Sequence, residues 1–351
     1  MTGSRAAVDG NAPVEVWHRI ATPASTMGPW LPSGDLGSSM TEGLGRVEEA
    51  LAAAVTSEHP FVSEAAGHLM AAGGKRFRPM LALLAAHLGD AQAPEVVQAA
   101  VVCELTHLAT LYHDDVMDEA AVRRGAQSAN SRWTNSVAIL TGDLLFARAS
   151  DILADLGPEA VRIQARTFER LVTGQIRETV GARDGEDRVA HYLEVLADKT
   201  GSLVATSARF GARFAGVAPE LVDALTRFGE EVGVAFQLSD DLLDIVTDGA
   251  SGKSPGTDLR EGIATLPALI ALAGDDPADA RLRELVSRPL SDDDEHAEAL
   301  ALLRASVALE RAGAVLREYA DRARASLSGV PAGEVREALS ALCDYVITRT
   351  S

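Results

Sequence analysis

The chain has 351 residues, of which 47% are hydrophobic and 4% aromatic, and its formal net charge is −19. This acidity argues against nucleic-acid binding and against a basic membrane-docking face, and it means that an anionic substrate needs a local group of cations. No apolar run approaches the roughly 18 residues of a transmembrane helix. Two cysteines, Cys103 and Cys343, without a CxxC pair favour a reducing, cytoplasmic compartment and no zinc site.

Residues 1–40 are predicted to form a flexible extension, because they are rich in Gly, Pro and Ser and show no sustained period. They lack the apolar segment of a signal peptide, and Met27 and Met40 are alternative start positions. Nothing after residue 40 has the composition of a linker. We therefore expect residues 41–351 to form one large domain.

Apolar residues spaced three and four apart predict helices through most of this domain. The predicted ranges are 42–57, 60–72, 79–88, 95–119, 134–156, 158–181, 187–215, 218–247, 263–273, 277–287, 292–325 and 332–349. No alternating strand run with a hairpin turn is evident. Abundant alanine with few aromatic residues favours packed helices over sheets. The expected fold is all-α, a bundle of many helices with a central cavity.

Two D-D-x-x-D motifs, at 114–118 and 240–244, each lie late in an apolar helical pattern. On a helix the first and last aspartates share a face, where like charges repel unless a cation compensates them. Mg²⁺ accepts carboxylate ligands and completes its shell with water and phosphate oxygens. A lone copy is more often a solvated surface, but two copies in such settings predict bound magnesium. The four predicted ligands are Asp114, Asp118, Asp240 and Asp244.

Basic residues flank the first motif on both sides. Lys75 and Arg78 lie around the Gly73-Gly74 turn just before a predicted helix, and Arg123 and Arg124 follow the motif closely. Backbone N–H groups and guanidinium forks suit a terminal diphosphate. The combination predicts a diphosphate held between magnesium and these cations.

The chain resembles the trans-isoprenyl diphosphate synthases, or polyprenyl synthetases, over residues 45–350. Five segments carry the resemblance: GGKRFRP, HDDVMDEAAVRRG, DKTGSL, FQLSDDLLDI and GKSPGTDLREG. It implies a magnesium-dependent prenyltransferase that joins isopentenyl diphosphate to an allylic diphosphate and so elongates an all-trans polyprenyl diphosphate. It also implies a homodimer, with at most peripheral membrane contact for product release. The alanine-rich stretch 95–113 is a candidate for the dimer interface or for the core.

The resemblance also assigns roles to single residues. It implies that the four aspartates hold the magnesium ions that clamp the allylic diphosphate, together with Arg123. The residues matched to the isopentenyl diphosphate site are Lys75, Arg78, His107 and Arg124. Lys199, Thr200 and Gln237 match residues beside the allylic group, and Lys253 matches a phosphate-contacting lysine. Ile263 stands where the family commonly has a second lysine, so one diphosphate contact is expected to be absent.

Helical spacing adds two independent expectations. Gln237 shares a face with the second pair of aspartates, whereas Asp115 and Asp241 are rotated off the motif faces and are expected to support the ligands from behind. The resemblance adds Gln175 as a further candidate, because it stands where the family often has a glutamine on the phosphate side.

The helix face below Asp114 bears on product length. It carries Thr110, His107, Thr106 and Cys103, with Ala109 beside them, whereas short-chain members of the family place Phe or Tyr four or five residues before the motif. We call this face, which carries no aromatic side chain, the open wall. It predicts a medium-to-long polyprenyl product, such as the tail of a quinone. A short-chain farnesyl or geranylgeranyl diphosphate synthase and a non-catalytic subunit of a heteromeric synthase remain alternatives. A terpene cyclase would not need the basic turn at 73–79.

Overall fold

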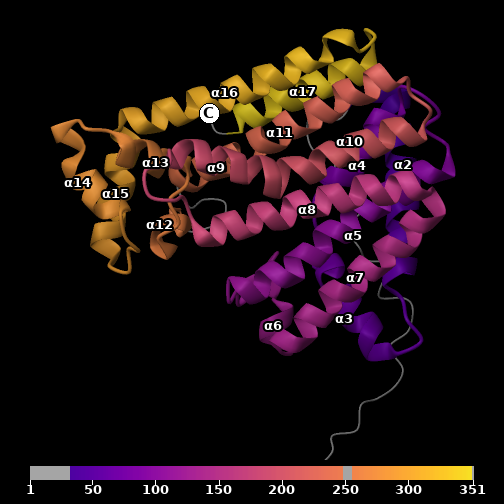
Figure 1. Cartoon of the computed structure of the whole chain (residues 1–351), viewed down its shortest axis with the longest axis horizontal. Coiled ribbons are helices and arrows are strands. Elements are labelled where there is room, and N and C mark those ends of the chain that lie inside the picture. The colour runs from indigo at the N-terminus through magenta and orange to yellow at the C-terminus, as the bar shows by residue number, and fades with distance from the viewer. Residues whose placement is uncertain (1–31, 248–254, 350–351) are drawn as a thin grey trace, which may run out of the picture.

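The computed structural model describes residues 32–247 and 255–349. Most of these residues lie in helices, and several of the longest helices run side by side (Figure 1). The first helices are α2 (Gly34–Val55), α3 (Pro60–Ala71), α4 (Phe77–Ala86), α5 (Pro94–Met117), α6 (Ala129–Arg132), α7 (Asn135–Leu156) and α8 (Pro158–Val180). Next come α9 (Arg188–Leu196), the π-helical turn η2 (Ala197–Gly201), α10 (Ser202–Phe214) and α11 (Pro219–Val246). The last elements are α12 (Thr257–Glu261), α13 (Leu266–Ala273), η3 (Pro277–Asp279), α14 (Ala280–Val286), α15 (Asp293–Ala305), α16 (Val307–Ser326), η4 (Leu327–Gly329) and α17 (Glu334–Thr348). The prediction of an all-α fold is confirmed.

Helix α5 runs through the centre of the bundle. It packs against α4, α7 and α10, and α10 in turn packs against α11. Small side chains such as Ala99 and Ala100 are fully buried along α5 and allow these close approaches. The stretch 95–113 is therefore core in the folded chain.

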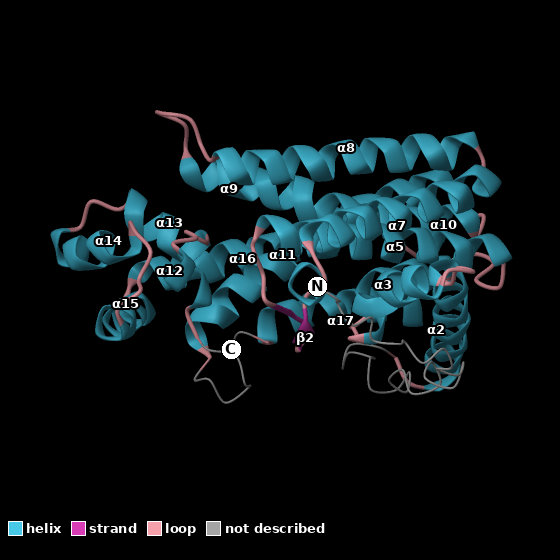
Figure 2. Cartoon of the chain, turned by 90° about the horizontal axis from the view of Figure 1, so that it is seen from below, coloured by secondary structure: helices cyan, strands magenta, loops and turns pink. Residues whose placement is uncertain are grey.

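Outer helices cover this centre on several sides. Figure 2 shows α8 and α9 as one outer layer, and α16 and α17 lie along another edge of the bundle (Figure 1). Helices α12 to α15 gather at one end around a smaller apolar cluster that includes Ile245, Leu259 and Leu285. This cluster fixes α12 beside the carboxyl end of α11. None of the described helices is long and apolar enough to cross a membrane.

Several predicted boundaries were wrong. A short antiparallel hairpin of β1 (Val122–Arg123) and β2 (Ala126–Gln127) follows the first aspartate motif, although no hairpin was expected. Helix α2 begins at Gly34, so part of the predicted extension is helical, and residues 1–31 lie outside the described chain. The predicted helix 187–215 is interrupted by η2. The one predicted over 292–325 breaks at Ser306, whose backbone is extended.

Candidate active site

The first aspartate motif ends α5. Asp114 is half-buried in the last turn, and Asp118 is the exposed residue that caps the helix. Burial raises the pKa of Asp114 to about 6; the positive charge of Lys199 opposes this shift, and the negative charge of Asp118 adds to it. A carboxylate held in this way is ready to exchange its proton for a metal ion.

Asp115 lies behind the motif and holds an arginine in place. Its carboxylate is fully buried, and its Oδ1 accepts a hydrogen bond from Arg123 Nε at 2.6 Å. The hairpin places Arg123 so that its Nη2 also lies 3.7 Å from Asp118 Oδ2. Asp115 therefore positions the guanidinium that the sequence pointed to as a diphosphate contact.

The second motif lies near the carboxyl end of α11. Asp241 is buried there and accepts a hydrogen bond from Tyr192 Oη at 2.6 Å; burial raises the pKa of its carboxyl to about 7, while the Tyr192 and Gln237 hydrogen bonds oppose the shift. Asp244 caps the start of α12 by accepting from the backbone N–H groups of Thr257 at 3.2 Å and Asp258 at 3.3 Å. The start of α12 is thus fastened to the motif.

Asp240 already has a cationic partner. Arg349, which caps α17 109 positions further along the chain, forms an ion pair with its carboxylate through Nη2. The same guanidinium lies over the ring of Phe236, 4.4 Å from the centroid. Sequence reasoning missed Arg349, because nothing near it in the chain points to α11.

The π-helical turn η2 carries Lys199 and Thr200 into the site. Lys199 forms an ion pair with Glu178 on α8, and Glu178 is close enough to act electrostatically on both Asp114 and Tyr192. Single π-helical turns of this kind often mark functional sites. The turn fits only because α8 has Gly174 there: a Cβ at that position would lie 2.7 Å from the backbone nitrogen of Lys199.

An arginine bridge holds η2 between its neighbours. Arg170 of α8 donates from Nε to Asp198 in η2 and from Nη2 to Glu230 in α11, both at 2.8 Å. Because this bridge fixes the turn on two sides, the position of Lys199 relative to the two motifs is set by packing and ion pairs together.

The basic segment 75–78 runs from the turn before α4 into the first residues of that helix, and its two arginines differ in their surroundings. Arg76 is buried and paired with Glu48 at 2.5 Å and Glu104 at 3.4 Å, so it serves the fold. Arg78 is half-buried, burial lowers its pKa, and its Nε has no hydrogen-bond partner. A buried guanidinium donor without a partner is suited to an anionic ligand.

Arg124 and His107 complete this cluster. Arg124 has a left-handed backbone (φ 54°), and its Nη1 donates to the Gly73 carbonyl and, at 3.1 Å, to that of Leu69. Gly74 allows the approach, because a Cβ there would lie 2.8 Å from Nη1 of Arg124. Burial and the charges of Arg78 and Arg124 hold the pKa of His107 well below its usual value, so its imidazole is neutral.

The surroundings of the remaining predicted residues say less about their roles. Lys75 is exposed on the turn, and Gln175 has a buried Oε1 without a partner. Ile263 is 49% exposed, and Lys253 lies outside the described residues. Gln237 lies on α11 beside Asp241, where its hydrogen bond favours the ionised carboxylate.

The aspartates fit a metal ion that is shared with a ligand. Within residues 32–247 and 255–349, no three His, Cys, Asp or Glu side chains are grouped so as to hold a metal by themselves. Mg²⁺ usually takes one or two carboxylates and draws its remaining ligands from water and phosphate. Desolvation disfavours an uncompensated charge on Asp114, and the ion pair of Asp240 with Arg349 shows that the second motif accommodates a positive charge beside it.

The wall below Asp114 is shorter than the sequence predicted. Thr110 and His107 are partly accessible, whereas Thr106 and Cys103 are fully buried. Gln164 of α8 closes the wall by donating from Nε2 to Thr106 Oγ1 at 2.8 Å. The expectation of an open wall down to Cys103 was wrong, because Gln164 of α8 covers Thr106 and Ser207 of α10 hydrogen-bonds with Cys103. Spacing along α5 cannot reveal either contact.

These features together define a class. An all-α bundle with aspartate motifs near the ends of α5 and α11, and with a cluster of guanidiniums around a half-buried histidine, is the arrangement of a prenyl diphosphate synthase. The chain belongs to the polyprenyl synthetase family, whose profile matches residues 59–303. It is therefore a prenyltransferase of isoprenoid biosynthesis.

Three relatives illustrate the match. The nonaprenyl diphosphate synthase of Mycobacterium tuberculosis (strain ATCC 25618 / H37Rv) is 49% identical over 94% of this chain and 99% of its own length. A geranylgeranyl pyrophosphate synthase structure from Corynebacterium glutamicum, complexed with calcium and isoprenyl diphosphate, is 45% identical, has a TM-score of 0.83 and covers 91% of this chain and 99% of its own. A decaprenyl diphosphate synthase structure from Rhodobacter capsulatus is 34% identical, has a TM-score of 0.81 and covers 90% of this chain and 98% of its own.

Proposed function

We propose that this prenyltransferase uses magnesium bound by Asp114, Asp118, Asp240 and Asp244 to transfer an allylic group to isopentenyl diphosphate. The observation that carries the proposal is the pairing of two acidic motifs with the cluster of Arg78, Arg123 and Arg124 around His107. A relative of known structure binds calcium and isoprenyl diphosphate, which supports a divalent cation with a diphosphate ligand. Bound Mg²⁺ would supply charge neutralisation for the leaving diphosphate.

The allylic diphosphate would lie between the motifs. Arg123 and Lys199 then donate to its oxygens and stabilise the charge that develops as the C–O bond breaks. Thr200 and Gln237 present polar atoms beside the allylic carbon. Lys253 is proposed as a further phosphate contact.

Isopentenyl diphosphate would occupy the basic cluster. Lys75, Arg78 and Arg124 hold its diphosphate, and neutral His107 donates a hydrogen bond without adding repulsion to the arginines. The double bond then attacks the allylic cation, and a proton passes to the released diphosphate. The product is longer by one isoprene unit, and no side chain acts as a nucleophile.

A medium-to-long product is the proposed outcome, because Thr110 leaves no aromatic barrier below Asp114 and the nonaprenyl diphosphate synthase is a 49% identical relative. A short-chain product is the second candidate. It is favoured by the Gln164–Thr106 hydrogen bond, which closes the wall within two turns of the motif. Sizing the product formed from labelled isopentenyl diphosphate and allylic primers of several lengths decides between them. Failure to extend any primer would contradict the proposed reaction and favour a non-catalytic subunit.

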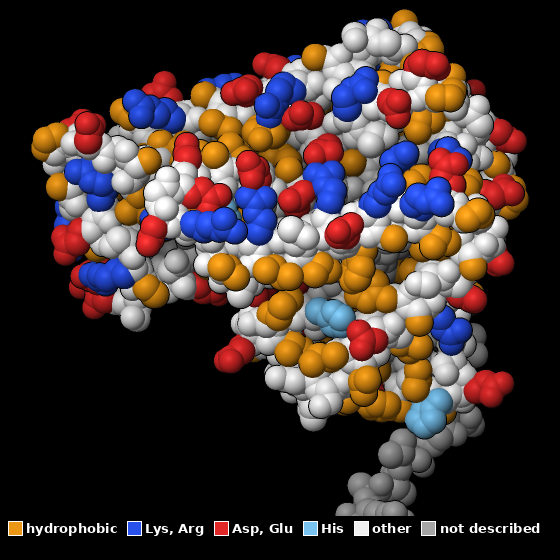
Figure 3. All heavy atoms as spheres, viewed as in Figure 1, with side chains coloured by type: hydrophobic (Ala, Val, Ile, Leu, Met, Phe, Trp, Pro, Cys, Tyr) orange, Lys and Arg blue, Asp and Glu red, His pale blue; other side chains and the backbone are white. Residues whose placement is uncertain are grey.

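A homodimer through α7 and α8 is proposed for the assembly. Large apolar side chains are exposed on these adjacent helices, and Figure 3 shows hydrophobic side chains gathered in a row along this flank. They are Ile139, Leu140, Val161, Val172, Ile176 and Val180. A contiguous exposed apolar patch favours association. Light scattering should give twice the chain mass, and Leu140→Glu with Ile176→Glu should give the monomer.

The catalytic domain is proposed to comprise residues 41–351 together with the start of α2 from Gly34, whose Leu36 and Met40 are buried in the core. The cytoplasm is proposed as its location. The two cysteines support a reducing compartment, because both are buried free thiols. Contact with a membrane would be peripheral and limited to release of the apolar product.

A further inference from the structure

Arg349 is bound to the second aspartate motif by two kinds of contact. Its Nη2 pairs with Asp240, and its guanidinium lies over Phe236. The Arg349 side chain is 11% exposed, against 44% for Asp240. A largely desolvated guanidinium between a carboxylate and a ring is held more firmly than an exposed ion pair.

The second motif is satisfied by the chain's own groups. Asp240 has Arg349, and Asp244 accepts the two N–H groups that begin α12. The first motif differs: Asp118 is 59% exposed, and its nearest guanidinium nitrogen lies 3.7 Å away. A divalent cation that approaches the second motif must therefore compete with the charge of Arg349 at Asp240. At the first motif it finds the more exposed carboxylate of Asp118.

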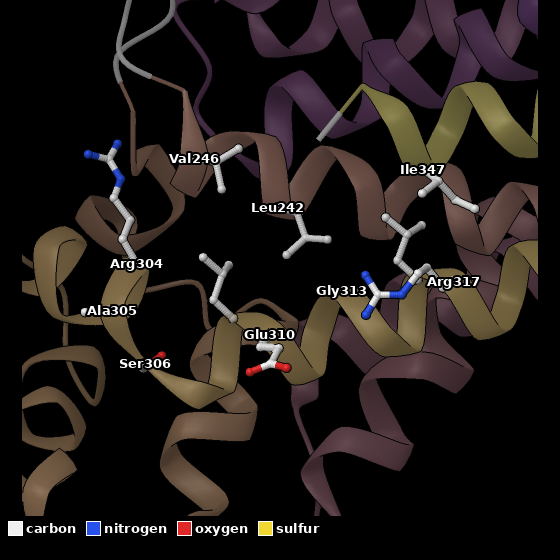
Figure 4. A pocket seen from close by; sticks show the side chains of 11 residues that line it. Leu242, Val246, Arg304, Ala305, Ser306, Glu310, Gly313, Arg317 and Ile347 are labelled. Atoms are coloured by element: carbon white, nitrogen blue, oxygen red, sulfur yellow. The ribbon is translucent and has the colours of Figure 1, made fainter. Parts of the chain in front are cut away.

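Arg349, which follows the last residue of α17, can leave Asp240 while the helix stays anchored in the core. Leu339, Leu342 and Val346 are fully buried and anchor the helix. Beyond Val346, Thr348 is exposed and Ile347 lines an open groove of about 450 Å³ together with Leu242 and Val246 (Figure 4). Arg349 also keeps one donor, Nη1, buried without a partner. Release of Arg349 therefore frees a donor that is unsatisfied in its present position.

We propose that Arg349 is the resident counter-cation of the second aspartate motif: it positions Asp240 in the ligand-free protein and is displaced when a divalent cation binds there with diphosphate. This inference rests on the proposed function of the motif as a metal site. It predicts that the first motif takes up a cation more readily than the second, and that the end of α17 is released as the second motif fills.

Direct cation binding tests the proposal without turnover. Free Mn²⁺ is followed by electron paramagnetic resonance during titration of the full chain, with no substrate present. Removal of the competing charge in Arg349→Gln should tighten binding at the second motif by about tenfold, equivalent to about 1.4 kcal/mol. Arg349→Lys, which keeps the charge, should stay near wild type. Arg324→Gln is the matched control, because it breaks another ion pair of α17, with Asp344 at 2.5 Å, away from the motif.

A second readout follows the release itself. Amides 347–349 should exchange with solvent faster when Mn²⁺ and inorganic diphosphate are added to wild type, and they should be fast from the start in Arg349→Gln. Equal Mn²⁺ affinity in wild type and Arg349→Gln, or equal tightening in Arg324→Gln, would overturn the proposal. The double variant Asp240→Asn with Asp244→Asn tests separately whether the second motif binds metal at all. If it binds as much Mn²⁺ as wild type, the proposed metal site itself is wrong.

Discussion

Arg123 Nε donates to Asp115 Oδ1 at 2.6 Å, and this contact ties the hairpin after the first motif to the end of α5. Asp115 is fully buried and does not share the face of Asp114. Its contribution to the site is the placement of a guanidinium.

Asp115→Ala should therefore act on substrate affinity more than on metal affinity. Without its partner, Arg123 loses its fixed position, and we expect the KM for the allylic diphosphate to rise about tenfold, a loss of roughly 1.4 kcal/mol. Steady-state kinetics at saturating and limiting Mg²⁺ separate the two effects. A loss that excess Mg²⁺ restores would instead make Asp115 a metal ligand.

The raised pKa of Asp114 predicts how activity depends on pH. A metal ligand must be deprotonated, so activity at limiting Mg²⁺ should fall as the pH drops through about 6. Because the metal competes with the proton, a high Mg²⁺ concentration should move this acidic limb to lower pH. If the acidic limb of the pH–activity profile stays at the same pH as the Mg²⁺ concentration is raised, Asp114 is not the group that causes it.

The same group affects the stability of the metal-free protein. The folded-state pKa of about 6 lies above the ordinary 3.8, so the folded chain binds the proton more tightly, and its free energy of unfolding falls as the pH rises between these values. Asp114→Asn should therefore raise the Tm at pH 7.5 and have little effect at pH 4. Thermal unfolding in chelator at both pH values checks the sign.

Substitutions at Arg76 and Arg78, two positions apart, should separate an effect on protein stability from an effect on substrate binding. Arg76→Met leaves Glu104 buried and unpaired, and we expect about 3–5 kcal/mol of destabilisation in urea unfolding. Arg78→Met should leave the fold nearly intact and raise the KM for isopentenyl diphosphate well above that for the primer. Equal effects of Arg78→Met on both substrates would mean that this cluster does not bind isopentenyl diphosphate.

Product length should respond to Thr110 and Gln164. Thr110→Phe places a ring on the accessible helix face below Asp114 and should shorten the product. Gln164→Ala removes the side chain that covers Thr106 and should lengthen the product. Ala109→Phe is a poorer test, because Ala109 is fully buried in the core and a ring there would disturb packing. Chromatographic sizing of the product shows the shifts, and unchanged length in both variants would place the floor of the cavity elsewhere.

Helical spacing along α5 and α11 predicted which aspartates lie off the motif faces. It placed Asp115 and Asp241 off the motif faces, and both prove to be buried behind their motifs, where they bind Arg123 and Tyr192. That prediction worked because it needed only the geometry within one helix. Family resemblance pointed to Lys199, but the π-helical turn that carries it depends on Gly174 of another helix and has no local pattern.

Contacts between distant segments could not be predicted in the same way. The pairing of Arg349 with Asp240 spans 109 positions, and Gln164 reaches Thr106 from a helix whose surface pattern gives no hint of it. The break at Ser306 has neither Gly nor Pro to mark it. These features arise from tertiary packing, which overrides the local period.

The central claim is that both aspartate motifs bind the cations needed for prenyl transfer. The most direct measurement is single-turnover condensation of labelled isopentenyl diphosphate with an allylic primer at saturating Mg²⁺, in wild type, Asp114→Ala and Asp240→Ala. Loss of one ligand should slow the reaction about a thousandfold in each variant, roughly 4 kcal/mol of transition-state stabilisation. Near-wild-type rates in either variant would contradict the two-site account.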